Sequence, residues 1–442
     1  MRCRCDSKNF RNPDRTAREC MTHHSRLPAG GWRLAAGRAR DTIAQVRILL
    51  FSGKGGVGKT SLAAATAIRL AATGRRTLVM SVDPAHSLSD AFALEGDLFS
   101  RATADPVAVA DRLWVQEVNI QAEVKRHWGD VAGYLSAVLR TTGLGEVEAE
   151  ELAILPGMEE LSAMMYVNQY QRDGRFDVVV LDCAPTAESL RFISMPDTLD
   201  WYMRHIFPAH RLLVKTVRPV VNRVSPVELP PDATFANIQS LSRRLEGVGA
   251  LLADPDLTSV RLVTNAERVV LRETQRAYVY FLLHGLTVDR IIVNRVLPDR
   301  VRDEFFVAWR RTAETVLHEI DAYFAPVPVS RVPLFDDEVI GMERLGWLAR
   351  QLYGESEDPA AVTRRERAFR FEKDRHGGHV VRLSMPFAAK QDIGVFKKGD
   401  ELIVEIGTLR RHIGLPTSMA GLVPTRATLE AGTLSVRLEA VS

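Results

Sequence analysis

Short apolar runs alternate along this chain with longer segments in which apolar residues recur every three or four positions. Each short run is typical of a strand buried on both faces, and each longer segment is typical of an amphipathic helix. The runs that we expect to form buried strands are residues 48–51, 76–82, 176–181, 260–264, 289–294 and 327–332. Strands that alternate with helices predict an α/β fold with a doubly wound, mostly parallel sheet covered by helices on both faces.

Two kinds of segment interrupt this alternation. Residues 111–120 alternate apolar and polar side chains, which predicts a strand at the edge of the sheet. Residues 121–172 and 189–255 have the pattern of helices broken by glycine and proline, with little strand character. We therefore expect these two stretches to form a helical subdomain inserted into an α/β domain that spans residues 46–353.

The C-terminal part of the chain follows a different pattern. Residues 354–375 are charged and polar, which predicts a linker. Residues 376–442 contain short segments of alternating apolar residues that are separated by glycine-containing turns. This second pattern is typical of antiparallel strands, so we expect a small all-β domain at the C-terminus.

Composition and charge narrow the class of protein. The chain is 46% hydrophobic and 26% charged, as in an ordinary globular protein, and no uncharged apolar run approaches the roughly 18 residues of a membrane span. Residues 1–45 hold ten basic and four acidic side chains, so this tail carries +6 and the remainder −3. We interpret the tail as disordered or as the product of a misassigned start codon; an arm that binds nucleic acid is the less favoured alternative, because the rest of the chain has no basic stripe with interleaved aromatics.

The glycine-rich turn after the first apolar run carries the strongest candidate chemistry. Gly53 and the triplet Gly58-Lys59-Thr60 fit the frame of a phosphate-binding loop. Its glycines let successive N–H groups surround a phosphate, towards which the following helix also directs its dipole. Lys59 can reach the β- and γ-phosphates, and the Thr60 hydroxyl can ligate Mg²⁺. The residues expected to bind nucleotide in this loop are Gly53, Lys54, Gly55, Gly56, Val57, Gly58, Lys59, Thr60 and Ser61.

Three polar residues follow the ends of other predicted strands, where an open α/β sheet places its ligand. Asp83 could orient and deprotonate an attacking water, and Asp182 could bind Mg²⁺ directly or through water. Asn294 could pair with the edge of a base. An isolated aspartate in such a place is usually a turn or cap residue, and an Asx-turn competes as an explanation for Asn294.

Lys54, the second residue of the loop, narrows the interpretation. It lies too close to its own loop to reach its own γ-phosphate easily, but it could cross a dimer interface to the nucleotide of a partner. The loop GKGGVGKT resembles the deviant phosphate loop of dimeric ATPases: the partitioning ATPases, the nitrogenase iron protein, and the ArsA and tail-anchored-protein targeting ATPases.

Further segments resemble the ArsA and tail-anchored-protein targeting family more specifically. Residues 83–92 resemble its switch I, and residues 181–186 with 190–192 resemble its switch II. Residues 274–278, 293–295 and 333–334 with 338–339 resemble its base-binding region, and the C-terminal segment resembles the small-heat-shock-like, α-crystallin-type domain of bacterial members. The resemblance covers roughly residues 46–353 of the ATPase part.

This resemblance implies a homodimer that closes over two ATP molecules with Mg²⁺. It implies that Lys59 and Thr60 hold phosphate and metal, and that Asp83 activates water. It also implies that Asp182 is the carboxylate on the metal side and that Lys54 reaches the opposing nucleotide. The residues that it places beside adenine are Asn294 and Pro333.

The chain also departs from this family. Ala187-Glu188 replaces the usual Gly-His of switch II, and no Cys-x-x-Cys zinc pair is present. Cys183 is the only cysteine after residue 45, which argues against a thiolate site for arsenite. The few cysteines fit a reducing cytoplasm.

We therefore expect a cytoplasmic, homodimeric Mg-ATPase whose nucleotide state controls the binding of a client protein, with membrane-protein segments as one kind of client. The alternatives are an arsenite-extrusion ATPase subunit and a nucleotide-gated scaffold with little turnover. Two apolar stripes, within residues 158–165 and 195–206, are candidates for a client groove, and ordinary core packing is the favoured alternative for them.

Overall fold

The computed structural model places most of the chain in one compact unit, Ile43–Ser442, apart from a unit Met1–Thr42. It describes residues 45–83, 87–94, 105–118, 158–184, 193, 203–204, 207–224, 232–367, 369–373, 378–407, 409–419 and 421–440. The predicted tail therefore lies outside the described residues apart from its last position, as do most of the helices expected within residues 121–172.

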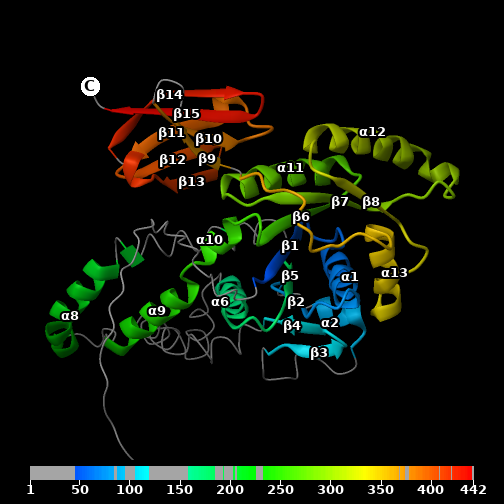
Figure 1. The fold of residues 1–442 in the computed structure, drawn as a ribbon, viewed down its shortest axis with the longest axis horizontal. Helices are drawn as coiled ribbons and strands as arrows, with labels where there is room; N and C mark the ends of the chain where they lie inside the picture. Colours follow the sequence, from blue (N-terminus) through cyan, green and yellow to red (C-terminus); the bar gives the residue numbers. More distant parts are fainter. Residues whose placement is uncertain are drawn as a thin grey trace, which may run out of the picture. The chain divides into compact units, whose positions relative to one another are not determined.

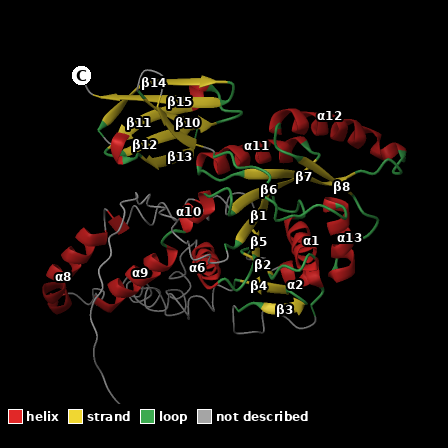
Figure 2. Cartoon of the chain, viewed as in Figure 1, coloured by secondary structure: helices red, strands yellow, loops and turns green. Residues whose placement is uncertain are grey.

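Eight strands form the main sheet (Figures 1 and 2). They are β1 (Arg47–Gly53), β2 (Thr77–Ser81), β3 (Val107–Ala110), β4 (Leu113–Glu117), β5 (Val178–Asp182), β6 (Thr258–Asn265), β7 (Val288–Val296) and β8 (Val329–Pro333). Their order is β3-β4-β2-β5-β1-β6-β7-β8, and all neighbours are parallel except β3 and β4. The predicted parallel α/β sheet is confirmed.

One strand differs from the prediction. The segment 111–120 forms β4, but β4 is not the edge strand, because β3 pairs with it in the antiparallel direction. β3 was not predicted because it has only four residues, VAVA, two of them small alanines, and none of its side chains is fully buried. A short, half-exposed strand is typical of a sheet edge.

Helices cover both faces of the sheet, because the side chains of each central strand alternate between two cores. Ile48 and Leu50 of β1 belong to one core, whereas Leu49 and Phe51 belong to the other. The helices of the first core are α6 (Met158–Asp173), α9 (Asp232–Leu245), α10 (Val248–Ala253), α11 (Arg268–Leu283) and α12 (Val307–Phe324). The helices of the second core are α1 (Lys59–Ala72), α2 (Ser87–Phe92) and α13 (Gly341–Tyr353).

A further helix, α8 (Phe207–Val224), packs through Phe207 and Val214 against Phe235 of α9. The 3₁₀ helix η3 (Glu304–Phe306) precedes α12. Within the described part of the chain, no helix is both long and apolar enough to cross a membrane.

The C-terminal segment forms two antiparallel sheets around a third core, to which Leu283 of α11 also contributes. The strands are β9 (Phe369–Lys373), β10 (His379–Ser384), β11 (Ile393–Lys398), β12 (Glu401–Ile406), β13 (Leu409–Gly414), β14 (Leu422–Glu430) and β15 (Thr433–Ala440), with the 3₁₀ helices η4 (Lys390–Asp392) and η5 (Thr417–Met419). One sheet has the order β14-β15-β10-β9 and the other β11-β12-β13. The predicted all-β character is confirmed, and β9 extends the sheet into residues that were predicted to be linker.

The first part of the predicted linker is also ordered. Residues 355–360, which we call the strap, are bound by arginine side chains that come from four elements of the α/β domain and from the turn before β2. Three of these guanidinium groups donate to strap carbonyl groups and two pair with strap carboxylates. The arginines are Arg69, Arg261 and Arg47, which donate to the carbonyls of Glu355, Pro359 and Ala360, and Arg290 and Arg75, which pair with Glu357 and Asp358.

Candidate functional site

The candidate site lies where the parallel strands end. β1 ends at Gly53, and the neighbouring β5 ends at Asp182, which is in register with Phe51 of β1 and with Ser81 of β2. Asp83 follows β2 by two residues, and its N–H donates to the Ser81 hydroxyl at 3.2 Å. Parallel strands deliver their carboxyl ends to one edge, so the topology brings the phosphate loop, Asp182 and the start of switch I together.

Two glycines of the loop are required by close contacts. A Cβ on Gly53 would lie 2.2 Å from the Val263 carbonyl oxygen of β6. A Cβ on Gly58 would lie 2.3 Å from the Nδ2 atom of Asn294, and the φ angle of Gly58 is +93°. Both approaches are far shorter than van der Waals contact, so the loop can lie against β6 and β7 only without these side chains.

The two residues that begin α1 carry the polar groups of the loop. Lys59 is buried, and its Nζ donates to the Lys54 carbonyl oxygen at 3.3 Å. The Thr60 and Ser87 hydroxyls lie 3.1 Å apart, so α2 of the predicted switch I contacts the loop directly. Lys54 is half-buried, whereas Gly55 and Gly56 beyond it are exposed.

Asp182 has the most unusual environment of these side chains. It is fully buried, and neither carboxylate oxygen has a hydrogen-bond partner in the described part of the protein. Burial raises its pKa to about 7; the nearby Thr60 hydroxyl and the Lys59 charge oppose this rise, and Asp83 adds to it. The Thr60 hydroxyl is near enough to favour the charged carboxylate, but it does not occupy either oxygen as a hydrogen-bond donor. Both oxygens of Asp182 are therefore available to a cation. The donor set of a carboxylate and a hydroxyl fits Mg²⁺.

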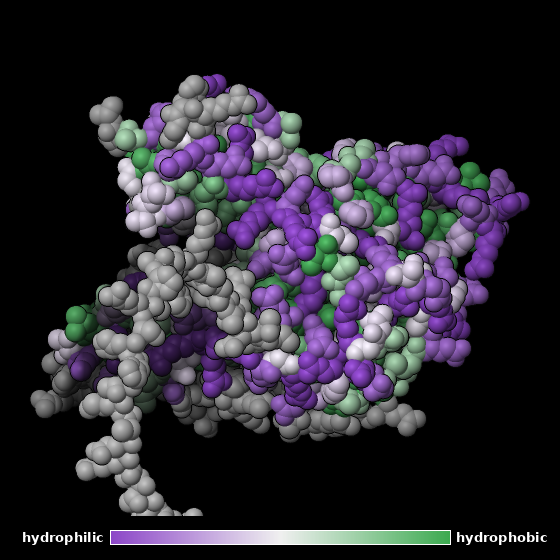
Figure 3. Space-filling view, in the orientation of Figure 1, coloured by the Kyte–Doolittle hydropathy of each residue, from purple (hydrophilic) through white to green (hydrophobic). Residues whose placement is uncertain are grey.

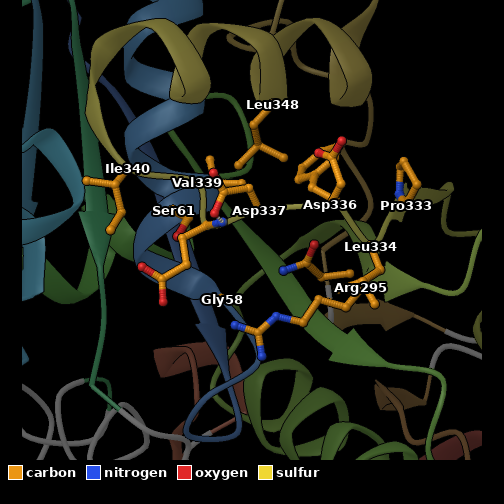
Figure 4. A pocket seen from close by; sticks show the side chains of 13 residues that line it. Gly58, Ser61, Arg295, Pro333, Leu334, Asp336, Asp337, Val339, Ile340 and Leu348 are labelled. Atoms are coloured by element: carbon orange, nitrogen blue, oxygen red, sulfur yellow. Dashed lines mark hydrogen bonds between the residues drawn. The ribbon is translucent and has the colours of Figure 1, made fainter.

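A pocket of about 560 Å³ adjoins the start of α1 (Figure 4). Gly58 and Ser61 form one side of it, and Asn294, Arg295 and Pro333 come from the ends of β7 and β8. This volume is typical of a small-molecule site. Leu334, Glu338 and Val339 also line the pocket, as the resemblance to a base-binding region predicts. The lining residues that the sequence did not single out are Phe335, Asp336, Asp337, Ile340 and Leu348. Most follow β8 directly, and the resemblance of residues 333–334 to a base-binding region was the available signal for them.

The amide of Asn294 has a fixed orientation in this pocket. Its Nδ2 donates to the Val57 carbonyl oxygen at 2.8 Å. Because a carbonyl accepts only from the nitrogen, this bond leaves the Oδ1 atom of Asn294 as an acceptor for a ligand. An acceptor of this kind suits the exocyclic amine of adenine and opposes the carbonyl of guanine.

The structure brings together all nine loop residues, Asp182, Asn294 and Pro333. Asp83 is half-buried at the same sheet edge, whereas residues 84–86 of switch I and residues 185–186 and 190–192 of switch II lie outside the described residues. No group of three or more potential metal-binding His, Cys, Asp or Glu side chains occurs in the described ranges. Cys183 is buried.

Comparison with known proteins decides the family. Residues 46–354 match the anion-transporting ATPases, and residues 376–438 match the HSP20-like domain found in ArsA. The chain belongs to the anion-transporting ATPase family. It is therefore an ATP hydrolase whose cofactors are ATP and Mg²⁺. The resemblance seen in the sequence is confirmed for both the ATPase part and the C-terminal β domain.

Relatives of this family member come from bacteria and plants. A protein of Aquifex aeolicus (strain VF5) with the provisional name arsenical pump-driving ATPase 1 is 43% identical over 389 residues, which are 87% of this chain and 98% of that protein. A provisionally named arsenical pump-driving ATPase of Chlorobaculum tepidum is 38% identical over 384 residues, 86% of this chain and 92% of that protein. ATPase GET3C of Arabidopsis thaliana is 29% identical over 326 residues, 70% of this chain and 82% of that protein.

Proposed function

We propose that this ATPase works as a cytoplasmic homodimer whose nucleotide state controls the binding of a client protein or hydrophobic segment. The observation that carries the nucleotide part is the buried Asp182 carboxylate beside Lys59 and Thr60. A buried charge without a partner is costly. Both oxygens of Asp182 lack a partner among the described residues, and Mg²⁺ bound with the ATP phosphates would supply one.

The positions of the side chains support one role for each of them. Lys59 would leave the Lys54 carbonyl, which it contacts at 3.3 Å, and bind the β- and γ-phosphates. Thr60 and Asp182 would hold Mg²⁺, which neutralises the phosphate charge that develops during transfer. Asp83, at the same edge of the sheet, would orient the attacking water.

Dimerisation would complete the site through Lys54. This side chain stands at the base of an exposed loop tip formed by Gly55 and Gly56, so it can meet a second protomer without displacing core residues. A Lys54→Ala variant should retain ATP binding but lose most hydrolysis, whereas Lys390→Ala, at an exposed position of the β domain, should leave both unchanged. Light scattering with and without a non-hydrolysable ATP analogue would test whether dimerisation depends on nucleotide.

The apolar stripes give mixed support for a client surface. Leu161, Met164 and Met165 are buried in the core beneath the sheet, so this part of the first stripe is structural, while the Met158 side chain and most of the second stripe lie outside the described residues. α8 instead exposes Leu212 and Leu213, which are 67% and 62% exposed. Exposed neighbouring leucines on an amphipathic helix suit a hydrophobic client.

The proposal is tested by capture with an ATP-locked variant. Asp83→Asn should bind ATP but hydrolyse it at least about 100-fold more slowly, because the water would lose its base. Asp111→Asn, in an exposed turn, is the matched control. The proposal is supported if Asp83→Asn with ATP captures proteins that carry hydrophobic segments. Capture should be lower with ADP, and lower in a variant that also carries Leu212→Ser and Leu213→Ser. Equal capture in all nucleotide states would refute the coupling.

The provisional names of two relatives favour arsenite extrusion as a second candidate. A metalloid site needs clustered thiolates, and Cys183 is buried. Arsenite should therefore leave the ATPase rate unchanged. Stimulation of the rate by arsenite that is lost in Cys183→Ser would favour this second candidate instead.

A further inference from the structure

The carbonyl groups of the phosphate loop receive side-chain donors at three positions. Lys59 donates to the carbonyl oxygen of Lys54, Arg295 donates to that of Gly56 at 2.9 Å, and Asn294 donates to that of Val57 at 2.8 Å. A loop that binds phosphate must point its N–H groups at the anion and therefore its carbonyl groups elsewhere. These donors hold the carbonyl groups in such an arrangement.

Two of the three donors, Asn294 and Arg295, are consecutive residues of β7, and consecutive side chains of a strand seldom reach the same loop. Side chains alternate between the two faces of a strand, so Asn294 and Arg295 should point in opposite directions. Arg295 avoids this because its φ angle is +56°, in the left-handed region, and the pairing of β7 with β8 is irregular between Val293 and Val296. Both side chains consequently reach the same loop, and Figure 4 shows the Arg295 side chain extending towards the loop at Gly58.

A left-handed conformation is uncommon for arginine and persists only where surrounding contacts hold it. Glycine or asparagine would adopt this conformation more readily, but neither could reach the Gly56 carbonyl as arginine does. The backbone conformation alone would favour glycine or asparagine at this position, so we attribute the presence of arginine to its guanidinium group.

We propose that Arg295 is a positioning residue for the phosphate loop: its bond to the Gly56 carbonyl holds the loop tip in the shape that accepts the ATP phosphates. This inference rests on the nucleotide site proposed above. When ATP binds, Lys59 leaves the Lys54 carbonyl for the phosphates. The loop is then held by Arg295 and Asn294, so Arg295 matters most when nucleotide is bound.

The guanidinium also lines the pocket beside the loop, so the alternative is a direct contact with the base. The two roles differ in which part of the nucleotide they affect. A positioning residue for the loop changes the affinity for pyrophosphate and leaves that for adenosine unchanged. A contact with the base changes the affinity for adenosine and leaves that for pyrophosphate unchanged.

The experiment measures inhibition of the ATPase by magnesium pyrophosphate and by adenosine, together with the KM for ATP, in the full chain. In Arg295→Ala we expect about a fivefold weaker inhibition by pyrophosphate and a similar rise in KM, which is the effect of one lost hydrogen bond of about 1 kcal/mol. Inhibition by adenosine should not change. Arg295→Lys should recover part of the loss, since an ammonium group can still donate to one carbonyl.

Two controls keep the inference open to refutation. Arg300→Ala, an exposed arginine that does not line the pocket, should behave as wild type. Arg295→Gly removes the guanidinium while relieving the backbone, and it should match Arg295→Ala. Wild-type pyrophosphate inhibition in Arg295→Gly or Arg295→Ala, or a loss confined to adenosine, would overturn the role of the guanidinium. Absence of MgATP binding by the wild-type chain would instead refute the proposed function itself.

Discussion

Replacing Asp289 by asparagine should destabilise the α/β domain strongly, because this residue is the buried counter-charge of two arginines. Its Oδ1 lies 3.4 Å from the Nε of Arg261, and its Oδ2 lies 3.8 Å from the Nη2 of Arg47. The Ser259 hydroxyl donates to the same Oδ2 at 2.8 Å. Asp289 and Arg261 are each only 2% exposed. Asparagine keeps the size of the side chain and removes its charge.

The expected magnitude follows from this burial. Removing one partner of a buried ion pair costs about 3–5 kcal/mol, because the other charge stays buried without compensation. Burial already lowers the pKa of Arg47 to about 10, against the opposing effect of Asp289, so the loss of Asp289 would remove a main support of its charge. For a domain of about 300 residues, about 1 kcal/mol shifts Tm by roughly 1.5 °C, so the expected shift is about 6 °C.

The assay is thermal unfolding followed by circular dichroism, with Asp358→Asn as the matched control. Asp358 forms two hydrogen bonds with Arg75, at 2.9 and 2.6 Å, but its side chain is 39% exposed. Because exposed pairs contribute about 0–1 kcal/mol, this control should lower Tm by at most about 2 °C. Equal shifts in the two variants, or a shift below about 2 °C for Asp289→Asn, would refute the assignment of Asp289 as a buried counter-charge.

Three further predictions concern other parts of the chain. Gly58→Ala should abolish most ATP binding, measured by calorimetry, because its Cβ would lie 2.3 Å from Asn294 Nδ2. The control Gly74→Ala has a similar positive φ but no atom within 4 Å of its Cβ, so it should bind ATP normally. Phe387→Ala should speed proteolysis in the β domain without changing the KM for ATP, because this ring contacts three aromatic rings of α11 and α12. Burial lowers the pKa of His284 to about 4, so the free energy of unfolding should fall as pH drops from about 6.5 to 4. Measured by urea unfolding, His284→Gln should remove up to about 3 kcal/mol of that fall.

The sequence identified the parts of the site that are set by local chemistry. The phosphate loop follows from its glycine spacing, and Asp182 follows from its place at the end of a fully apolar run. Parallel topology then brings such strand ends together, so the position of Asp182 near Lys59 was predictable without coordinates. The roles assigned to these side chains remain predictions.

Features that depend on distant contacts could not be predicted in this way. The strap has the charged composition of a linker, and nothing local shows that its carbonyls and carboxylates meet arginines from other elements. The left-handed conformation of Arg295 also has no signal in the apolar run that precedes it. It depends on the Gly56 carbonyl, to which Arg295 donates and which lies far away in the sequence. β9 was missed because three of the five residues in FRFEK are charged and the strand is only partly buried.

The strap also determines where this protein can be divided. Similarity to the ATPase family ends at residue 354, which suggests a cut between the two modules there. A fragment that ended at 354 would lose the carbonyl groups that accept from Arg261 and Arg47 and would leave buried donors unpaired. Gene fusion or loss of the β domain would therefore be tolerated best at a junction after the strap. The ATPase segment that has to be inherited together therefore includes the strap, which lies beyond the end of the family match at residue 354.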